Sequence, residues 1–218
     1  MYVNEFFFEK SPYLCVNIFL EKIFMKIALF AAVPEEVGSW ADHVNFTGIG
    51  RENATRTALA FMQRHAGEKI TVVNFGTVGA HHLPVGTVLS INEITSAGRI
   101  FDPHPMITDH FSVPAAQGLP TATLFSSDSF VSPSVYTADY LQRIQQQADC
   151  FDMESSALYT VVKQFGVPYV SFKIVSDNLD VDIDEWHRRV VELSKNLCVF
   201  MEKLIGELSE NEPVEFIK

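Results

Sequence analysis

The sequence has few basic residues for its acidic content, and this argues against one class of partner. It contains 16 Lys and Arg against 27 Asp and Glu, which gives a formal net charge of −11. Sites for a nucleic-acid backbone need clustered Lys and Arg, because these side chains neutralise the phosphates. We therefore expect no nucleic-acid partner.

Cysteine is also scarce. The three cysteines, Cys15, Cys150 and Cys198, are far apart and lack the short spacings of metal ligands. An odd, scattered set argues against a disulfide framework and is typical of reduced thiols in the cytosol. No nucleophile signature surrounds any of them. We expect a cytoplasmic protein without a catalytic cysteine.

Long uninterrupted apolar runs are missing. Residues 1–24 are rich in Phe and Ile but also contain Glu5, Glu9 and Glu21. They lack the basic start and the cleavage site of a signal peptide, and their apolar runs are too short to span a bilayer, so we expect no membrane partner. A strand pattern begins directly after Met25. Our hypothesis is that Met25 is the natural start and that residues 1–24 are an N-terminal extension; a surface-attached helix is the alternative.

The remaining residues, 25–218, alternate between apolar strand patterns and amphipathic helix patterns, without repeats or linkers. Such alternation indicates a single α/β domain, and we predict a three-layer sandwich with a central, largely parallel mixed sheet. Pro34 suits the first turn of a helix, residues 76–79 form an expected glycine-rich turn, and residues 96–119 form an expected long loop. The expected strands are 26–32, 69–75, 87–93, 121–125 and 167–175, and the expected helices are 51–65, 137–147, 154–165 and 183–208.

Four polar residues, Glu36, Thr77, Asp128 and Asp177, lie just past predicted strand ends. Ligands of open α/β sheets gather at this edge. Asp177 follows a strongly apolar strand, where partial desolvation raises the pKa of a carboxylate and suits it to act as a general acid. A helix N-cap is the equally weighted alternative for Asp177.

Two glutamates each allow two interpretations. Glu36 either complements the dipole at a helix start or holds and deprotonates a water. Glu154 is either an acid in the first turn of a helix or the acceptor for both hydroxyls of a ribose diol, since one carboxylate can accept two O–H bonds.

Several short segments occur in the order of one known family. Together they resemble the nucleoside phosphorylase and nucleosidase superfamily and, within it, the 5′-methylthioadenosine/S-adenosylhomocysteine nucleosidases. The segments are Ala32–Val37 (AVPEEV), Gly48–Gly50 (GIG), Asn74–Gly79 (NFGTVG), Ser127–Val131 (SDSFV), Asp152–Ala157 (DMESSA), Gly166–Val170 (GVPYV) and Ile174–Asp177 (IVSD).

The resemblance implies hydrolysis of the N-glycosidic bond of an adenosine-type nucleoside, with adenine released. It implies that Asp177 protonates the purine and receives its 6-amino group, and that Glu36 activates the attacking water. The implied substrate-binding residues are Glu154 and Met153 for the ribose, Phe130 and Val131 for the base, Thr77 and Lys173 beside the nucleophile, and also Val78, Gly79 and Ser176.

Other functions within and beyond the family stay open at this point. The charge of Glu36 would repel phosphate, which favours hydrolysis over phosphorolysis. The carboxylate of Asp177 suits a 6-amino better than a 6-oxo purine. Futalosine hydrolase, a nucleoside phosphorylase and an inactive nucleoside-binding module are the alternatives. The family has a hairpin for which residues 40–46 are too short, and a helix that residues 96–119 lack. Both elements lie near the 5′ pocket and dimer contacts of the family, so the 5′ substituent and the implied homodimer are left open.

A metal site is a further alternative. Histidines and aspartates gather in two places, and loop ligands of this kind can bind zinc. Scattered loop histidines are more often solvated or hydrogen-bonded, and helical His spacing is missing. We therefore expect no metal and no cofactor. The residues considered are His81, His82, Asp102, His104, Asp109 and His110.

Overall fold

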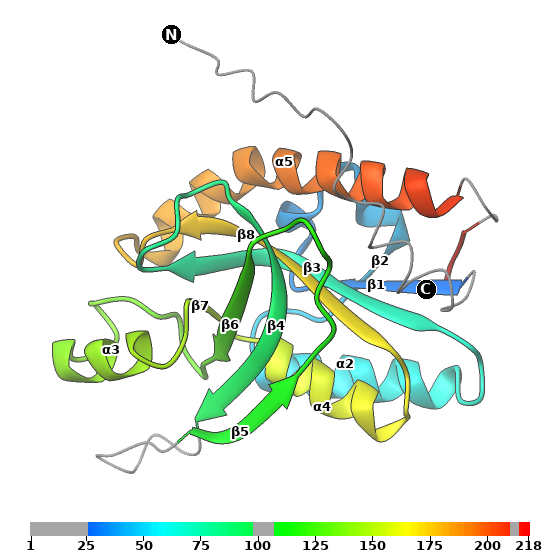
Figure 1. The fold of residues 1–218 in the computed structure, drawn as a ribbon, viewed down its shortest axis with the longest axis horizontal. Helices are drawn as coiled ribbons and strands as arrows, with labels where there is room; N and C mark the ends of the chain where they lie inside the picture. The colour runs from blue at the N-terminus through cyan, green and yellow to red at the C-terminus, as the bar shows by residue number, and fades with distance from the viewer. Residues whose placement is uncertain (1–25, 98–106, 210–213) are drawn as a thin grey trace, which may run out of the picture.

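The structure is a computed structural model, and it describes residues 26–97, 107–209 and 214–218. The predictions about residues 1–24, and those about Asp102 and His104, lie outside the described residues. Figure 1 shows how the described elements are arranged.

Strands and helices alternate along most of the chain, as the sequence pattern predicts. The strands are β1 (Lys26–Ala31), β2 (Val44–Phe46), β3 (Thr71–Ala80), β4 (Val88–Ala97), β5 (Ile107–Ser112), β6 (Thr121–Ser126), β7 (Cys150–Asp152), β8 (Tyr169–Asp177) and β9 (Glu215–Phe216). The helices are α2 (Arg51–Arg64), α3 (Ala138–Gln145), α4 (Ser155–Gln164) and α5 (Ile183–Ser209), with the 3-10 helices η1 (Pro34–Glu36) and η2 (Gly38–His43).

All described strands belong to one mixed sheet in which most pairings are parallel. The antiparallel pairings are β3 with β7, β4 with β5, and β4 with β8. Helix α5 lies on one side of the sheet and helices α2 and α4 on the other (Figure 1). The predicted α/β class and the three-layer arrangement around a largely parallel mixed sheet are therefore confirmed.

The sheet also closes on itself, which the sequence pattern did not predict. Strand β8 pairs with both β3 and β4. The strands β3, β7, β6 and β4 are also neighbours in that order, so β8 closes the ring. Closure depends on the length of β3 and β4. One end of β4, Val88–Ser90, pairs with β8, and the rest of the strand pairs with β6. The ring brings the ends of β3, β7 and β8 together.

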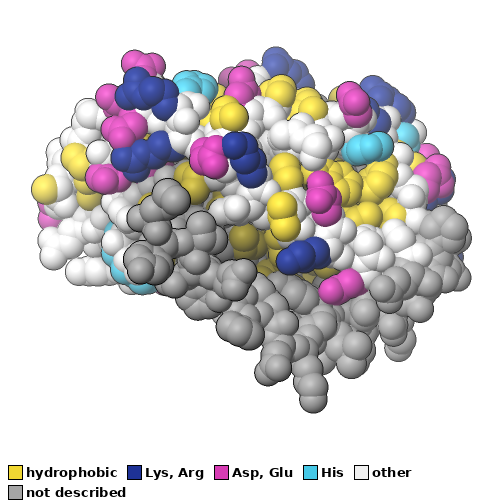
Figure 2. All heavy atoms as spheres, turned by 90° about the horizontal axis from the view of Figure 1, so that it is seen from above, with side chains coloured by type: hydrophobic (Ala, Val, Ile, Leu, Met, Phe, Trp, Pro, Cys, Tyr) yellow, Lys and Arg dark blue, Asp and Glu magenta, His cyan; other side chains and the backbone are white. Residues whose placement is uncertain are grey.

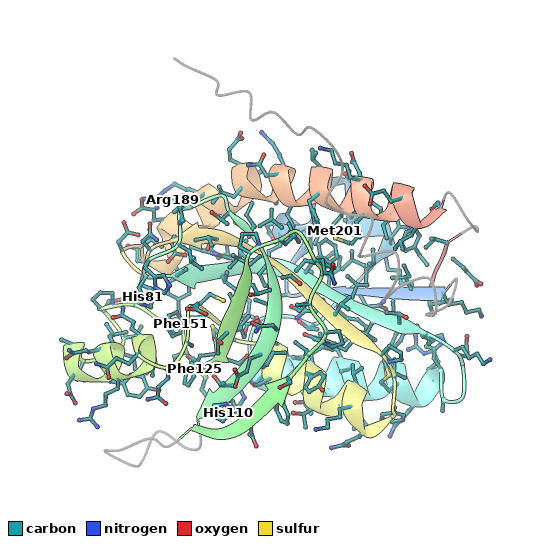
Figure 3. All side chains as sticks on the ribbon, in the orientation of Figure 1. His81, His110, Phe125, Phe151, Arg189 and Met201 are labelled. Atoms are coloured by element: carbon teal, nitrogen blue, oxygen red, sulfur yellow. The ribbon has the colours of Figure 1, made fainter. Side chains whose placement is uncertain are left out.

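Two apolar layers hold the helices against the sheet. Phe30 of β1 meets Phe61 of α2 edge to face, with ring centroids 5.1 Å apart. On the other side Phe172 of β8 packs on Phe200 of α5, also at 5.1 Å. Met201 of α5 is fully buried in this second layer (Figure 3). The spacing of apolar residues in α2 and α5 thus places one helical face on each side of the sheet.

Three local expectations are corrected by the structure. Residues 76–79 continue strand β3 instead of forming a turn, because both of its neighbours, β7 and β8, provide pairing partners there. Residues 107–112, inside the expected loop, form β5 against β4. Pro34 does begin a helical turn, but the helix is a short 3-10 turn rather than an α-helix.

The α5 face of the molecule carries side chains of both charge signs, interspersed with hydrophobic ones (Figure 2). The net negative charge is therefore not gathered in one patch on this face. Among the described helices, none has the length and apolar character needed to cross a membrane.

We expect Phe30→Ala to lower the free energy of unfolding by about 3–5 kcal/mol, because it opens a cavity between β1 and α2. Phe30 is fully buried. Val199→Ala is the control, since Val199 is 49% exposed and its truncation should change stability by only about 0.5 kcal/mol. Denaturant unfolding of both variants measures the difference, and equal effects would contradict the proposed packing.

Candidate active site

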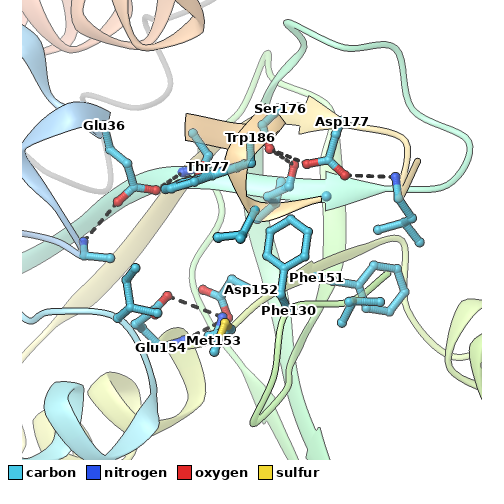
Figure 4. Close-up of a pocket in the computed structure, with 17 residues that line it drawn as sticks. Glu36, Thr77, Phe130, Phe151, Asp152, Met153, Glu154, Ser176, Asp177 and Trp186 are labelled. Carbon is cyan, nitrogen blue, oxygen red and sulfur yellow. Dashed lines mark hydrogen bonds between the residues drawn. The ribbon is translucent and has the colours of Figure 1, made fainter. Parts of the chain in front are cut away.

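A cavity that is open to solvent lies where strands β3, β7 and β8 end. Glu36 and Asp177 enter it from two sides, with Trp186 and Phe130 between them and Glu154 below (Figure 4). Among the predicted site residues, those that line the cavity are Glu36, Thr77, Val78, Gly79, Phe130, Val131, Met153, Glu154, Ser176 and Asp177.

Glu36 is buried and surrounded by hydrogen-bond donors. Its Oε1 accepts from the backbone N–H of Thr77 at 2.8 Å and from the Thr77 hydroxyl at 2.7 Å. Its Oε2 accepts from the N–H groups of Ala32 and Val33 at 3.1 and 3.4 Å. These four donors fix the orientation of the Glu36 side chain, and the two contacts to Oε2 are the longer ones.

Two glycines of β3 make room for the two carboxylates. A Cβ atom at Gly76 would lie 3.0 Å from Glu36 Oε1, and a Cβ atom at Gly79 would lie 3.0 Å from Asp177 Oδ1. Glycine inside a strand often marks such a close approach. Glycine at these two positions of β3 therefore leaves space for the two carboxylates.

Asp177 ends strand β8 and is 1% exposed. Burial raises the pKa of its carboxyl, while hydrogen bonds from the Ser176 hydroxyl and the Leu179 N–H act in the opposite direction. Leu179 reaches this position with a φ of 64°, in the left-handed region. The side chain is thus suited to carry a proton that a buried neighbour could receive.

The hydroxyl of Ser176 can serve both protonation states of Asp177. Its oxygen lies 2.8 Å from Asp177 Oδ2 and 3.1 Å from the carbonyl oxygen of Val78. A hydroxyl has only one hydrogen to donate. When Asp177 is ionised, that hydrogen points to Oδ2. When Asp177 is protonated, the Ser176 oxygen can accept a hydrogen bond from the Asp177 O–H and donate its own hydrogen to the carbonyl of Val78, so neither form is left unpaired.

Glu154 is held by the turn before α2. The N–H of Gly50 donates to its Oε1 at 2.7 Å, and the N–H of Met153 donates to Oε2 at 3.3 Å. Gly48 and Gly50 have φ angles of 78° and 94°, which glycine adopts without strain. The turn therefore aims a backbone donor at Glu154, which is the N-cap residue of α4.

Lys173 is the one predicted site residue that does not line the cavity. Its ammonium group is buried and lies 3.2 Å from Asp152 Oδ2. Burial lowers the pKa of Lys173, but the charges of Asp152, Glu36 and other neighbours outweigh it and raise the pKa to about 12. Asp152 also accepts from the Ser126 hydroxyl and the Ser155 N–H at the start of α4. The positive charge of Lys173 thus compensates part of the negative charge of the buried acids from a position outside the cavity lining.

Some contributors were missed or misplaced by sequence reasoning. Trp186 and Ile183, both in α5, also line the cavity. Asp128, one of the four strand-end residues, instead points outward and pairs with Arg51 at 3.2 Å. Residues that were not among the predicted site residues also line the cavity, namely Ala32, Ile49, Phe151, Asp152 and Leu179.

The histidines considered for a metal have protein partners in the described chain. His82 contacts His81 and Asp149, and His110 contacts Glu93. Among the described residues, no group of three or more His, Cys, Asp or Glu side chains has the arrangement of a metal site.

Comparisons with known proteins agree on one family. A sequence model of the phosphorylase superfamily matches residues 43–206. A 5′-methylthioadenosine/S-adenosylhomocysteine nucleosidase of Shewanella halifaxensis is 28% identical over 170 residues, covering 66% of this chain and 73% of that protein. The corresponding Shewanella oneidensis protein is 25% identical over 199 residues, covering 77% and 80%.

Two solved structures from Helicobacter pylori share the fold. The nucleosidase of the same name, crystallised with butyl-thio-DADMe-Immucillin-A, has a TM-score of 0.69 at 15% identity and covers 84% of this chain and 98% of its own. A futalosine hydrolase has a TM-score of 0.69 at 15% identity and covers 86% and 99%. At this identity the similarity shows a common fold.

Glu154 should make stability depend on pH. Burial and the nearby Asp152 charge raise its pKa from the usual 4.5 to about 8. Because the folded form keeps this proton to higher pH than the unfolded chain, its contribution is full below pH 4.5 and is lost as pH rises to about 8. Glu154→Gln removes the titration. Urea unfolding across this range should therefore show wild type losing stability relative to the variant, and parallel pH profiles would contradict this.

Proposed function

The chain belongs to the phosphorylase superfamily, and we propose that it hydrolyses the N-glycosidic bond of an adenosine-type nucleoside and releases adenine. The observation that carries the proposal is the cavity lined by two buried carboxylates, Glu36 and Asp177, with different hydrogen-bond partners. Cleavage of this bond needs an acid on the purine and a nucleophile at the sugar, by analogy with the two carboxylates of other glycoside hydrolases.

In this proposal Asp177 is the acid. Its raised pKa lets it carry a proton to N7 of the purine, which neutralises the charge that develops on the leaving base. The proton passes from the carboxyl oxygen to N7 as the C1′–N9 bond breaks. Ser176 then donates to the carboxylate left behind, because its hydroxyl lies 2.8 Å away. The other carboxylate oxygen accepts from the 6-amino group.

Glu36 holds the attacking water and takes its proton. The bonds to its Oε2, at 3.1 and 3.4 Å, are longer than those to Oε1, at 2.8 and 2.7 Å. Oε2 therefore has the weaker existing contacts and the greater capacity for a further hydrogen bond. The water oxygen forms the new bond to C1′, and its proton goes to Glu36. The ribose and adenine are the products.

The remaining lining residues bind the substrate. Glu154 binds the two ribose hydroxyls and accepts from both when its carboxyl group is ionised, and Met153 packs beside the sugar. Phe130 stacks on the purine ring and the backbone of Val131 contacts its edge. Thr77 lies beside the nucleophile. Lys173 does not line the cavity, and it contributes indirectly by forming an ion pair with Asp152, which does.

Water is favoured over phosphate by charge. Four acids, Glu36, Asp152, Glu154 and Asp177, line one cavity. A phosphate dianion entering it would be repelled by every ionised member of this set, and the interaction is strong where water is excluded. A neutral water has no such cost, so this observation supports hydrolysis rather than phosphorolysis.

The substrate class proposed is 5′-methylthioadenosine and S-adenosylhomocysteine, as in the named relatives. Ile49 and Ile183 line the cavity and are 39% and 42% exposed, so its margin is apolar and suits a thioether substituent. We also propose a role in methionine salvage, a homodimer in which a second copy covers this margin, and a cytoplasmic location. The buried free thiols of Cys150 and Cys198 suit a reducing compartment.

We expect the purified protein to release adenine from 5′-methylthioadenosine without added phosphate, because water is the nucleophile. Chromatography of the free base measures this. The same assay with S-adenosylhomocysteine, adenosine and futalosine ranks the substrates. Release that requires phosphate would favour a phosphorylase, preference for futalosine would favour the rival hydrolase, and binding without release would favour the inactive module.

The matched variant is Asp177→Asn, which keeps the shape of the side chain but cannot donate an acid proton. It should lower kcat by about 10²–10⁴-fold, the usual contribution of general acid catalysis, while circular dichroism shows a folded protein. Near-normal turnover in this variant would refute the role of Asp177.

A further inference from the structure

Trp186 connects helix α5 to the carboxylate of Glu36 through one hydroxyl. The residue lies in the first turn of α5, is 7% exposed and lines the cavity. Its indole N–H donates to Thr77 Oγ1 at 3.3 Å, and the Thr77 hydroxyl in turn donates to Glu36 Oε1 at 2.7 Å (Figure 4). Three side chains from distant parts of the chain thus form one hydrogen-bond network, Trp186–Thr77–Glu36.

The direction of these bonds is fixed by chemistry. An indole N–H can only donate, so Thr77 must be the acceptor, and the single hydroxyl hydrogen of Thr77 is then left for another oxygen. The carboxylate of Glu36 can only accept when ionised, and it lies within reach of that hydrogen. The indole therefore orients the Thr77 hydroxyl toward Glu36.

Trp186 itself is held rigidly. Its ring packs in a small apolar cluster with the buried residues Val181 and Val190, and Val33 and Phe130 pack against the same cluster. Val33 also donates its N–H to Glu36 Oε2. The apolar cluster therefore links Trp186, at the α5 end of the hydrogen-bond network, with Val33, whose N–H donates to Oε2 of Glu36.

We propose that Trp186 is a positioning residue for the water-activating glutamate, acting through the Thr77 hydroxyl. This inference rests on the proposed function, because Glu36 has a nucleophile to position only if the protein hydrolyses its substrate. With the indole N–H present, the Thr77 hydroxyl is a permanent donor to Oε1, which leaves the more weakly bonded Oε2 to take the proton of the water. Without it, the hydroxyl is free to accept from Glu36-bound water or to rotate away.

The variant that tests this is Trp186→Phe, which keeps an aromatic ring but removes the N–H. We expect kcat for 5′-methylthioadenosine to fall roughly three- to tenfold, as loss of one hydrogen bond of ordinary strength predicts, with KM changed less than twofold. In a Thr77→Val background the same substitution should cause no further loss. The control is Trp40→Phe. Trp40 lies outside the cavity and packs on Phe216 at 5.6 Å, and its indole nitrogen has no hydrogen-bond partner among the described residues.

A second measurement needs no turnover. The chain has two tryptophans, Trp40 and Trp186, so their indole N–H signals can be assigned by NMR from the two Phe variants. Thr77→Val should shift the Trp186 signal and speed its hydrogen exchange, and it should leave the Trp40 signal unchanged.

The outcomes separate the two proposals. An unmoved Trp186 signal, an equal kcat loss in both Thr77 backgrounds, or a rise in KM at constant kcat would each overturn the positioning role. If the wild-type protein released no adenine while the Trp186 signal still moved in Thr77→Val, the proposed function would fail, but the hydrogen-bond network of Trp186, Thr77 and Glu36 would be supported.

Discussion

Burial of two carboxylates at one end of a closed sheet is the constraint to which the rest of the site responds. A buried acid must be paired, hydrogen-bonded or protonated, because its charge is costly away from water. Glu36 meets this demand with four donors. Asp177 has two, and burial raises its pKa. The two acids therefore differ in environment, and such a difference is how one site divides acid and base roles.

The fold supplies those environments through backbone geometry. Strand β3 runs between the two acids, and its glycines at positions 76 and 79 let both carboxylates approach the backbone closely. Closure of the sheet places β8, which carries Asp177, directly beside β3. Lys173 pairs with Asp152 behind the cavity, so that a buried cation offsets part of the negative charge without occupying the space for a ligand.

Much of this could be predicted from the sequence because it depends on local patterns. Apolar strands such as 26–32 and amphipathic helices such as 183–208 have distinct periodicities, and their polar ends predicted Glu36 and Asp177 at one edge. Closure of the sheet could not be predicted, because it depends on which strands pair at long range. The same holds for β5, a short strand that forms only against β4. The position of Lys173 beside the nucleophile was implied by the family resemblance, and a sequence resemblance does not show that its ammonium group contacts Asp152 and does not line the cavity.

The central claim is that Asp177 and Glu36 act on opposite sides of one bound ribosyl purine. A crystal structure with a non-hydrolysable adenosine analogue carrying a 5′-thioether tests it most directly. The account predicts Asp177 within hydrogen-bond distance of N7, Glu154 on the ribose hydroxyls, and a water between Glu36 and the anomeric carbon. An analogue bound elsewhere, or bound with Asp177 facing away from the purine, would contradict the account.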